Sequence, residues 1–533
     1  MKKATIFKNA RSRSELYWII GLFVAAIALW TVALGNVPLR DWDEGSHALV
    51  ARELYRQGDW IYLTFFDQPN FMKPPLSYWL VASSYHLFGE VNEWTTRFPV
   101  AMITACGVPL LYLVGREVFS SRRPALLSAG VYLTLLPVVR HGRLMMLDGI
   151  INTFLILLIL CLLRSRKSPI LAFGMGISAA AIALTKGMLA LALGTVVFVF
   201  VLCDRRWHIF RNPYTWLGLF LGLSAVLSWY YAQWSKYGDI FIQTHLGTQN
   251  FDRLHTAVEG NDGPPWYYIL ELLKYSFPWL LFLPSGLFLA VQSARNFGAK
   301  TAESWGNLVL SGFLVFFTTI SLMGTKLPWY VMPLYPFLAL AVGAALYQIM
   351  QDRRFFSAFY VTFLCLFALA GIGGIGYFWV VDKQPLLMGM SGVVSLTCGL
   401  AAWQHYQRSE NFIFSLLGGM YLTLLLLMLS PVWNWELNEQ FPVVAIGQII
   451  REHTSPGQII YTSFAYNRPS LDFYSDRQVY PADINTLQQK RATQHYLLLD
   501  SATITQLQIP QEDIIGVDHH SGFSLIKPSR PSS

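Results

Sequence analysis

Apolar runs, separated by short clusters of charged or turn-forming residues, fill most of the first 431 positions of the chain. Each run is close to the length of about 20 residues that lets a helix cross a hydrocarbon core of roughly 30 Å. The pattern predicts thirteen membrane-spanning helices, near residues 16–36, 96–116, 124–140, 148–164, 169–185, 187–203, 213–231, 268–292, 305–323, 327–350, 355–379, 384–403 and 412–431. An odd number of spans places the two ends of the chain on opposite sides of the membrane.

The pattern changes after Pro431, where the long apolar runs end and short alternating runs begin. Residues 458–463, 495–500 and 522–527 alternate as strands do, and residues 443–453 have the spacing of a helix. We therefore predict a mainly α, polytopic membrane protein with two domains. A transmembrane domain covers residues 1–431, and a small soluble α/β domain covers residues 432–533.

Two of the predicted outer loops, residues 37–95 and 232–266, are much longer than the usual connection of about 2 to 8 residues between neighbouring helices. Long ordered loops often carry function. Within the first loop, residues 45–56 and 76–88 have amphipathic helical patterns. Both segments are predicted to form short helices that lie in the plane of the membrane interface.

The composition supports this class of protein. The chain is 54% hydrophobic and 13% charged, with a mean hydropathy of +0.41, whereas soluble domains average roughly 25% charged residues. A soluble enzyme, a disordered chain and a disulfide-stapled secreted domain are excluded. All five cysteines fall inside predicted spans, and no Cys/His spacing typical of a metal site is present in the sequence.

The formal net charge of +8 does not indicate nucleic-acid binding, because the basic residues gather in the short segments that follow every second predicted span. Examples are Arg116, Arg122, Arg164, Arg206 and Arg408. Short segments rich in Lys and Arg face the cytoplasm. The N-terminus is therefore predicted to be cytoplasmic, and the C-terminal domain is predicted to lie on the outer, periplasmic side.

The first outer loop begins with three carboxylates within four residues, Asp41, Asp43 and Glu44. They can be solvated interface residues, but a helix N-terminus follows them, which favours nearby anions. Lys73 lies further along the same loop, and Arg97 beyond it is either a second site cation or a residue that snorkels at a helix end. A carboxylate beside cations at the lipid boundary can act as a base toward an acceptor while the cations hold a phosphate.

Other charged positions can be either ordinary loop residues or members of the functional site. The segment 140–143 with Asp148 forms either a plain outer turn or part of the site, and Lys186 is either a loop charge or a site residue. Glu271 and Lys274, three residues apart on a predicted span, are expected to pair with each other.

Short motifs follow one another along the chain: Asp43-Glu44, Phe71-Met72-Lys73-Pro74-Pro75, Arg97-Phe98-Pro99, Thr185-Lys186-Gly187, Pro265-Trp266-Tyr267-Tyr268, Lys326-Leu327-Pro328-Trp329-Tyr330-Val331-Met332-Pro333, and Arg468-Pro469-Ser470 with Phe473-Tyr474. Taken together, and in this order, they resemble the GT-C glycosyltransferases. More narrowly, the chain is similar to the branch that holds the lipid A aminoarabinose transferase and the protein O-mannosyltransferases. The resemblance covers nearly the whole chain, although each motif alone is weak.

This resemblance implies an inverting glycosyltransferase of the bacterial inner membrane, which moves a sugar from a polyprenyl-phosphate donor to a lipid A-type lipid, a glycan or a protein on the outer face. Asp43 would be the catalytic carboxylate, with Glu44 as its neighbour in the site. Lys73, Arg253 and Arg97 would contact the donor phosphate. The donor pocket would be lined by Tyr330, Lys326, Asn250 and His245.

The sequence does not decide whether the site binds a divalent metal ion. The aminoarabinose branch has a glutamate just before the motif lysine, whereas this chain has Met72, and a thioether is a poor ligand for a hard or borderline cation. If an ion binds, Glu44, His245 and Asn250 are the candidate ligands. No nucleotide is expected, because the lipid phosphate is already a good leaving group, and the sequence has no phosphate-cradling Gly-rich loop of the known kinds.

Three rival functions remain. A transporter or flippase of lipid-linked sugars predicts ionisable residues near the middle of the spans, whereas here the charged residues gather in the outer loops. A glycan ligase of the same architecture is hardly separable by sequence. A non-catalytic scaffold would leave the Asp-Glu and Lys-Pro-Pro motifs without a role.

Overall fold

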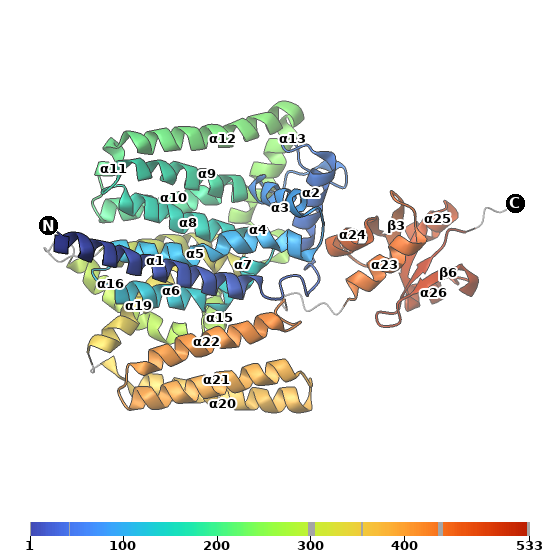
Figure 1. The fold of residues 1–533 in the computed structure, drawn as a ribbon. Coiled ribbons are helices and arrows are strands. Elements are labelled where there is room, and N and C mark those ends of the chain that lie inside the picture. The colour runs from blue at the N-terminus through green and yellow to red at the C-terminus, as the bar shows by residue number, and fades with distance from the viewer. Residues whose placement is uncertain (1, 42, 297–303, 353–354, 435–440, 530–533) are drawn as a thin grey trace. The chain divides into compact units, whose positions relative to one another are not determined.

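The computed structural model describes residues 2–41, 43–296, 304–352, 355–434 and 441–529 (Figure 1). The chain forms two compact units. The helical unit comprises Met1–Leu34, Phe71–Ser77 and Arg97–Trp433, and the mixed unit comprises Gly35–Asn70, Tyr78–Thr96 and Asn434–Ser533. Two of the points at which the chain passes from one unit to the other fall within helices, α3 (Leu76–Phe88) and α4 (Glu93–Ala105).

The helical unit is built from long apolar helices with few polar interruptions. Its first part contains α1 (Lys2–Thr31), most of α4, α5 (Gly107–Val118), α6 (Arg122–Leu133), α7 (Leu136–Arg143), α8 (Leu147–Arg164), α9 (Phe173–Lys186), α10 (Leu189–Cys203), α11 (His208–Arg211) and α12 (Pro213–Tyr237). Its second part contains α13 (Asp239–Ile242), the π-helix η2 (Gln243–Phe251), α14 (Asp252–His255), α15 (Tyr267–Tyr275), α16 (Leu283–Arg295), α17 (Trp305–Ser311), α18 (Phe317–Leu322), α19 (Tyr335–Gln351), α20 (Ala358–Val380), α21 (Pro385–Tyr406) and α22 (Asn411–Leu429).

All thirteen predicted spans correspond to apolar helices, but the described residues contain only ten helices long and apolar enough to cross a membrane, or up to twelve if each bent pair counts as one span. The pair α6 and α7 bends by 57°, and α15 bends by 118° against the segment Trp279–Arg295. Pro137 and Pro278 lie at these breaks, where proline cannot donate the backbone hydrogen bond that would continue the helix. The predicted span at 187–203 is the shorter helix α10, with 15 residues.

Close helix contacts in this unit depend on small residues. Helices α9 and α12 pack side by side (Figure 1), and a Cβ atom at Gly176 would lie 2.0 Å from the Gly218 carbonyl carbon. A Cβ atom at Gly343 of α19 would lie 2.2 Å from the Ser128 hydroxyl of α6. Small residues of this kind let membrane helices approach closely enough for van der Waals packing to hold them together.

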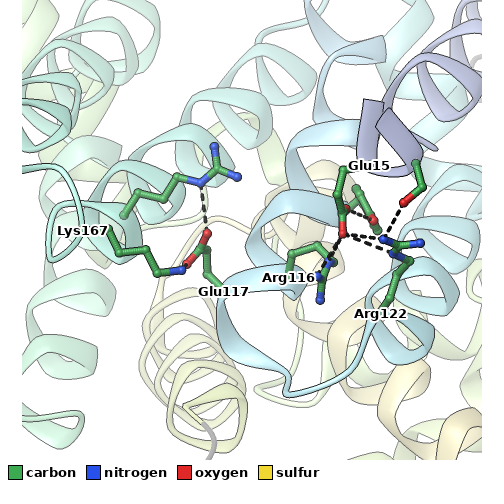
Figure 2. Close-up of polar contacts among 8 residues, drawn as sticks. Glu15, Arg116, Glu117, Arg122 and Lys167 are labelled. Carbon is green, nitrogen blue, oxygen red and sulfur yellow. Dashed lines mark hydrogen bonds and ion pairs between the residues drawn. The ribbon is translucent and has the colours of Figure 1, made fainter. Parts of the chain in front are cut away.

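Basic residues of several predicted cytoplasmic segments pair with two glutamates in two clusters (Figure 2). Glu15 of α1 accepts hydrogen bonds from Arg116 at 3.1 Å and Arg122 at 3.2 Å. Glu117 forms ion pairs with Arg164 and Lys167. The turn segments that the charge pattern assigns to one side of the membrane therefore lie together.

The mixed unit combines the first outer loop with the C-terminal domain. It contains α2 (Asp43–Gln57), β1 (Thr64–Phe65), β2 (Gln68–Pro69), most of α3, α23 (Val443–His453), β3 (Ile459–Thr462), α24 (Pro469–Ser475), β4 (Gln478–Pro481), α25 (Ile484–Ala492), β5 (Tyr496–Asp500), α26 (Ser501–Gln506), β6 (Ile514–Val517) and β7 (Phe523–Ile526). The five-stranded sheet has the order β4-β3-β5-β7-β6. Strands β4 and β5 are parallel to β3, and β7 is antiparallel to both β5 and β6. The predicted helices and the three predicted strands are all present, whereas β4, β6 and α24 to α26 were not predicted.

The apolar face of α2 packs inside this unit. Ala48 and Leu49 of α2 belong to one hydrophobic core with Ile446 of α23, Leu471 of α24 and Leu498 of β5. This packing explains why residues 35–70 and 78–96 join the C-terminal domain in one compact unit, so that the division differs from a single boundary after residue 431.

Candidate functional site

The carboxylates of the first outer loop differ sharply in their surroundings. Glu44 is fully buried, and its Oε2 accepts a hydrogen bond of 2.7 Å from the backbone N–H of Arg40, just before α2. Asp43, the first residue of α2, is only half-buried. Among the residues that the structure describes, the Asp43 carboxylate has no hydrogen-bond or ion-pair partner. Asp43 is therefore the carboxylate with acceptor capacity to spare, and Glu44 stabilises the N-terminal turn of α2.

Helix α2 is fixed against α3 by a buried polar contact. His47 Nδ1 lies 3.0 Å from the Tyr78 hydroxyl, and the two rings meet edge to face with their centroids 5.5 Å apart. Burial raises the pKa of Tyr78, so that this hydroxyl stays protonated and keeps its hydrogen-bonding capacity.

A pocket of about 250 Å³ opens in the helical unit. Its charged members are Lys73, Lys186, Arg253 and Asp148, so three cations face a single carboxylate among the described lining residues. The rest of the wall is mostly apolar, formed by Met188, Leu189, Leu191, Ala192, Leu254, Phe316, Ile320, Met323 and Pro333. A wall of this kind fits a ligand with a hydrocarbon part and a negatively charged head.

Asp148 and Lys186 form an ion pair in the wall of the pocket. Lys186 Nζ donates to Asp148 Oδ1 at 2.8 Å, and it also lies 4.9 Å from the centre of the Tyr330 ring. Asp148 belongs to the first turn of α8, and Lys186 is the last residue of α9. The structure therefore assigns both residues to the pocket wall, where the sequence left a plain turn and a loop charge as alternatives.

Asn250 and Arg253 come from the π-helix η2 and the short helix α14 that continues it. π-Helical segments are rare and often occur at functional sites. Two backbone hydrogen bonds from residues 324–325 hold this segment in place. The N–H of Thr325 donates to the Arg253 carbonyl at 3.1 Å, and the N–H of Gly324 donates to the Leu254 carbonyl at 2.8 Å. Both predicted side chains, Asn250 and Arg253, line the pocket.

His245 does not line the pocket but supports the segment that carries Lys73. Its Nδ1 lies 2.7 Å from the Phe71 carbonyl, and its Nε2 lies 2.9 Å from the Tyr230 hydroxyl. Because a carbonyl only accepts, Nδ1 must carry the proton, and Nε2 accepts from Tyr230. The side chain of Asn250 also donates to the His245 backbone carbonyl. His245 thus fixes the backbone two residues before Lys73.

The burial of His245 predicts a pH dependence of stability. Burial lowers its pKa to about 4, from the ordinary value of 6.5. Between these values the unfolded chain binds a proton that the folded chain does not, so the free energy of unfolding falls as the pH is lowered from 6.5 toward 4, by at most about 3 kcal/mol. The thermal unfolding midpoint in detergent, measured at pH 7, 5.5 and 4.5, should fall more steeply with decreasing pH for the wild type than for His245→Asn. Equal slopes in the two proteins would contradict this account of His245.

Two predicted site residues lie elsewhere in the helical unit. Arg97 is fully buried; its Nη1 donates to the Leu34 carbonyl at 3.0 Å, and its guanidinium lies 5.1 Å from the centre of the Trp433 ring. Lys326 Nζ donates to three backbone carbonyls at the end of α18, those of Ile320, Ser321 and Met323. Neither residue belongs to the pocket wall. Arg97 therefore joins chain segments, and Lys326 caps a helix C-terminus.

The candidate metal ligands do not fit an ion. Both ring nitrogens of His245 have protein partners, and the Glu44 carboxylate is engaged at its own helix terminus. No group of three or more His, Cys, Asp or Glu side chains that could hold a metal ion is found within the described parts of the chain. We therefore derive no step through a metal.

The predicted pairing of Glu271 with Lys274 is confirmed. Lys274 Nζ donates to Glu271 Oε1 at 3.0 Å, and the two residues stand three apart on α15. Neither lines the pocket, so this pair has no part in the candidate site.

Comparisons with known proteins agree with the motifs. The family model for dolichyl-phosphate-mannose-protein mannosyltransferase matches residues 72–231. The undecaprenyl phosphate-alpha-4-amino-4-deoxy-L-arabinose arabinosyl transferase of Shewanella sediminis is 29% identical over 350 residues, which cover 64% of this chain and 62% of that protein. A second such transferase, from Pseudomonas fluorescens, is 26% identical over 441 residues, covering 79% and 73%. The alignment with the Shewanella relative thus spans less than two thirds of that protein's length.

The fold has a solved counterpart. The crystal structure of ArnT from Cupriavidus metallidurans bound to undecaprenyl phosphate superimposes with a TM-score of 0.78 at 19% sequence identity, covering 96% of this chain and 98% of that chain. The predicted fold, mainly α and polytopic with a small C-terminal α/β region, is confirmed. The family model and the two relatives support the resemblance that the motifs indicated.

Proposed function

We propose that this chain, which belongs to the GT-C glycosyltransferases of the aminoarabinose transferase type, moves a sugar from a polyprenyl-phosphate carrier to an acceptor lipid. Undecaprenyl phosphate-linked 4-amino-4-deoxy-L-arabinose is the first donor to test, because the relatives carry that name. A lipid A-type lipid is the corresponding acceptor.

The observation that supports this function most strongly is the composition of the pocket wall. Lys73, Arg253 and the Lys186–Asp148 pair surround one region, and apolar side chains form the rest of the wall. The three cations exceed the single carboxylate by two charges, which suits the phosphate of a lipid carrier. No nucleotide is required, since the carrier phosphate itself leaves.

The proposed chemistry balances in one displacement. The acceptor hydroxyl oxygen attacks the anomeric carbon while the bond from that carbon to the phosphate oxygen breaks, and the configuration inverts. Asp43 takes the hydroxyl proton, and the leaving polyprenyl phosphate gains a negative charge. Lys73 and Arg253 stabilise this developing charge, as oriented cations do in transferase sites. The roles of Asp43, Lys73 and Arg253 rest on the family motifs together with the exposure of Asp43 and the pocket wall.

The function is tested by mass spectrometry of lipid A, glycans and glycoproteins from cells with and without this protein. We expect one class of molecule to lose a mass equal to one sugar residue in the deletion strain and to regain it when the gene is restored. Identical profiles in all three strains, under conditions in which the protein is made, would refute transfer to these acceptors.

The proposed orientation places the N-terminus in the cytoplasm and the C-terminal domain outside. In a cysteine-free background, a cysteine replacing the exposed Asp59 should react with a membrane-impermeant maleimide added to intact cells with a permeable outer membrane. A cysteine replacing Arg166, in a basic segment between spans, should react only after the inner membrane is opened. The reverse pattern of labelling would overturn the orientation.

A further inference from the structure

The segment that carries Asp43 is held by a buried polar contact with the C-terminal domain. Both oxygens of the Asp41 carboxylate are used: Oδ2 accepts from Arg468 Nη1 at 2.8 Å, and Oδ1 accepts from the Ser470 N–H at 3.0 Å and from the Ser470 hydroxyl. Asp41 and Arg468 are 7% and 8% exposed. All of these residues belong to the mixed unit. A charge pair this deeply buried holds its partners in one geometry, because breaking it leaves an unpaired charge.

Arg468 is itself held in place by aromatic rings. Its guanidinium carbon lies 4.4, 4.8 and 4.9 Å from the ring centres of Phe441, Phe464 and Tyr466. Its Nη2 donates to the Tyr466 hydroxyl at 2.7 Å. A guanidinium enclosed in this way has little rotational freedom, so it presents Nη1 to Asp41 in a fixed direction.

A second contact lies on the other side of Asp43 in the sequence. A Cβ atom at Gly45 would lie 2.7 Å from the Ser470 backbone nitrogen. Only glycine permits this close approach of α2 to the start of α24. Asp41 and Gly45 thus touch the same short segment, residues 468–470, and neither contact uses the Asp43 carboxylate.

The remainder of α2 is fastened to the same domain. Arg52 Nη1 donates to the Phe473 carbonyl at 2.7 Å, and Arg56 forms two hydrogen bonds, of 2.7 and 3.1 Å, with the Asp476 carboxylate. Upstream of α2, the Leu39 N–H donates to the Tyr474 hydroxyl at 2.8 Å. These contacts flank the acidic segment and hold it against α24.

We infer that Arg468 and Ser470 of the C-terminal domain are positioning residues that set the placement of Asp43 through Asp41 and Gly45. This inference rests on the proposed function for its effect on catalysis. It gives the C-terminal domain a role in the reaction itself, beyond binding an acceptor or covering the site. A catalytic group displaced by about 1 Å loses up to roughly 100-fold in rate, even when the mutated residue is remote from the chemistry.

The first test compares Arg468→Ala and Arg468→Lys with a matched control, Arg491→Ala. Arg491 forms an ion pair of 2.7 Å with Asp513 in the same domain, remote in sequence from α2. We expect Arg468→Ala to lower kcat about 10- to 100-fold with the donor KM changed less than 2-fold, Arg468→Lys to recover part of kcat, and Arg491→Ala to leave kcat unchanged. Unchanged kcat in folded Arg468→Ala, or an equal loss in both alanine variants, would overturn the inference.

The second test uses Gly45→Ala. The added methyl group would lie 2.7 Å from the Ser470 backbone nitrogen, so a purely structural role predicts a less stable protein whose folded fraction keeps the wild-type kcat. The positioning role predicts that the added methyl group displaces α2 from Ser470 and lowers kcat at least 10-fold. Gly418→Ala on α22, where nothing lies within 4 Å of the added Cβ atom, serves as the control and should keep the wild-type kcat. Full kcat in Gly45→Ala would count against the inference.

A readout that needs no activity separates this inference from the proposed function. Amide hydrogen exchange in residues 43–50 of the full-length protein should become faster in Arg468→Ala and stay as in the wild type in Arg491→Ala. If the wild type transfers no sugar, the proposed function is wrong. The hydrogen-exchange result then tests by itself whether Arg468 holds residues 43–50 in place. Equal exchange in this segment in all three proteins would overturn the inference whatever the activity.

Discussion

Replacing Asp43 with Asn is expected to lower the rate of sugar transfer by about 10²- to 10⁴-fold, the usual contribution of a general base. The asparagine side chain has nearly the same shape but cannot take the acceptor proton. Because Asp43 is partly exposed and has no hydrogen-bond or ion-pair partner within the described part of the chain, folding should be unaffected. The measurement is kcat of the purified variant with a polyprenyl-phosphate sugar, together with its thermal unfolding midpoint.

Asp59→Asn provides the control for this experiment. Asp59 is an exposed carboxylate of the same outer loop, and its Oδ1 accepts hydrogen bonds of 3.1 Å from the backbone N–H groups of Ile61 and Tyr62. An asparagine oxygen can accept the same bonds, so Asp59→Asn should keep wild-type activity. Full activity of Asp43→Asn would remove Asp43 from the mechanism.

The second large effect is expected for Lys73→Ala. A charge-assisted hydrogen bond contributes about 1.5 to 3 kcal/mol, so its loss should lower kcat/KM for the donor roughly 10- to 150-fold. Lys73 lines the pocket, and His245 fixes the backbone that presents it through the Phe71 carbonyl. Steady-state kinetics with varied donor give the value directly.

Two variants sharpen this result. Lys73→Arg keeps the charge but changes its geometry, and should recover only part of the loss. Lys274→Ala removes a lysine that pairs with Glu271 outside the pocket wall, and should leave donor kinetics unchanged. If Lys73→Ala uses the donor as well as the wild type does, the phosphate belongs to other cations.

The local elements of the mixed unit could be predicted wherever the sequence pattern is regular. The segments 45–56, 76–88 and 443–453 are helices in the structure, since their apolar spacing is continuous. Strand β4 ends in Pro481, and β6 contains Gly516 at an irregularity of its pairing with β7. Neither strand has a regular alternation of apolar and polar residues, and both are stabilised by pairing with neighbouring strands. The hydrophobic pattern alone therefore does not predict them.

The candidate site could be predicted only in part, because the charge of a residue and its motif do not determine which groups its side chain contacts in the folded protein. Lys73, Asn250 and Tyr330 do line the pocket. Arg97 and Lys326 carry the same positive charge as Lys73, yet their partners are backbone carbonyls that only the folded chain brings near. No local pattern distinguishes a lysine that caps a helix from one that faces a ligand.

A signal for two further pocket residues was present in the sequence. Asp148 and Lys186 are ionisable residues at the ends of otherwise apolar spans, and such residues in membrane segments often mark functional sites. They are only secondary candidates in the sequence, because a separation of 38 residues conceals that they pair at 2.8 Å. The ion pair forms because α8 packs against α9, and the sequence alone does not show this packing.

The central claim, that this protein breaks the bond between a sugar and a lipid phosphate, is tested most directly by a single-turnover assay in nanodiscs. The purified protein is mixed with a labelled polyprenyl-phosphate sugar and lipid A, and all lipid products are measured by mass spectrometry. The account predicts one free polyprenyl phosphate for each glycosylated acceptor, with the configuration of the sugar inverted. If the donor stays intact, while the same protein in vesicles carries it from one leaflet to the other, the molecule is a transporter and the account is wrong.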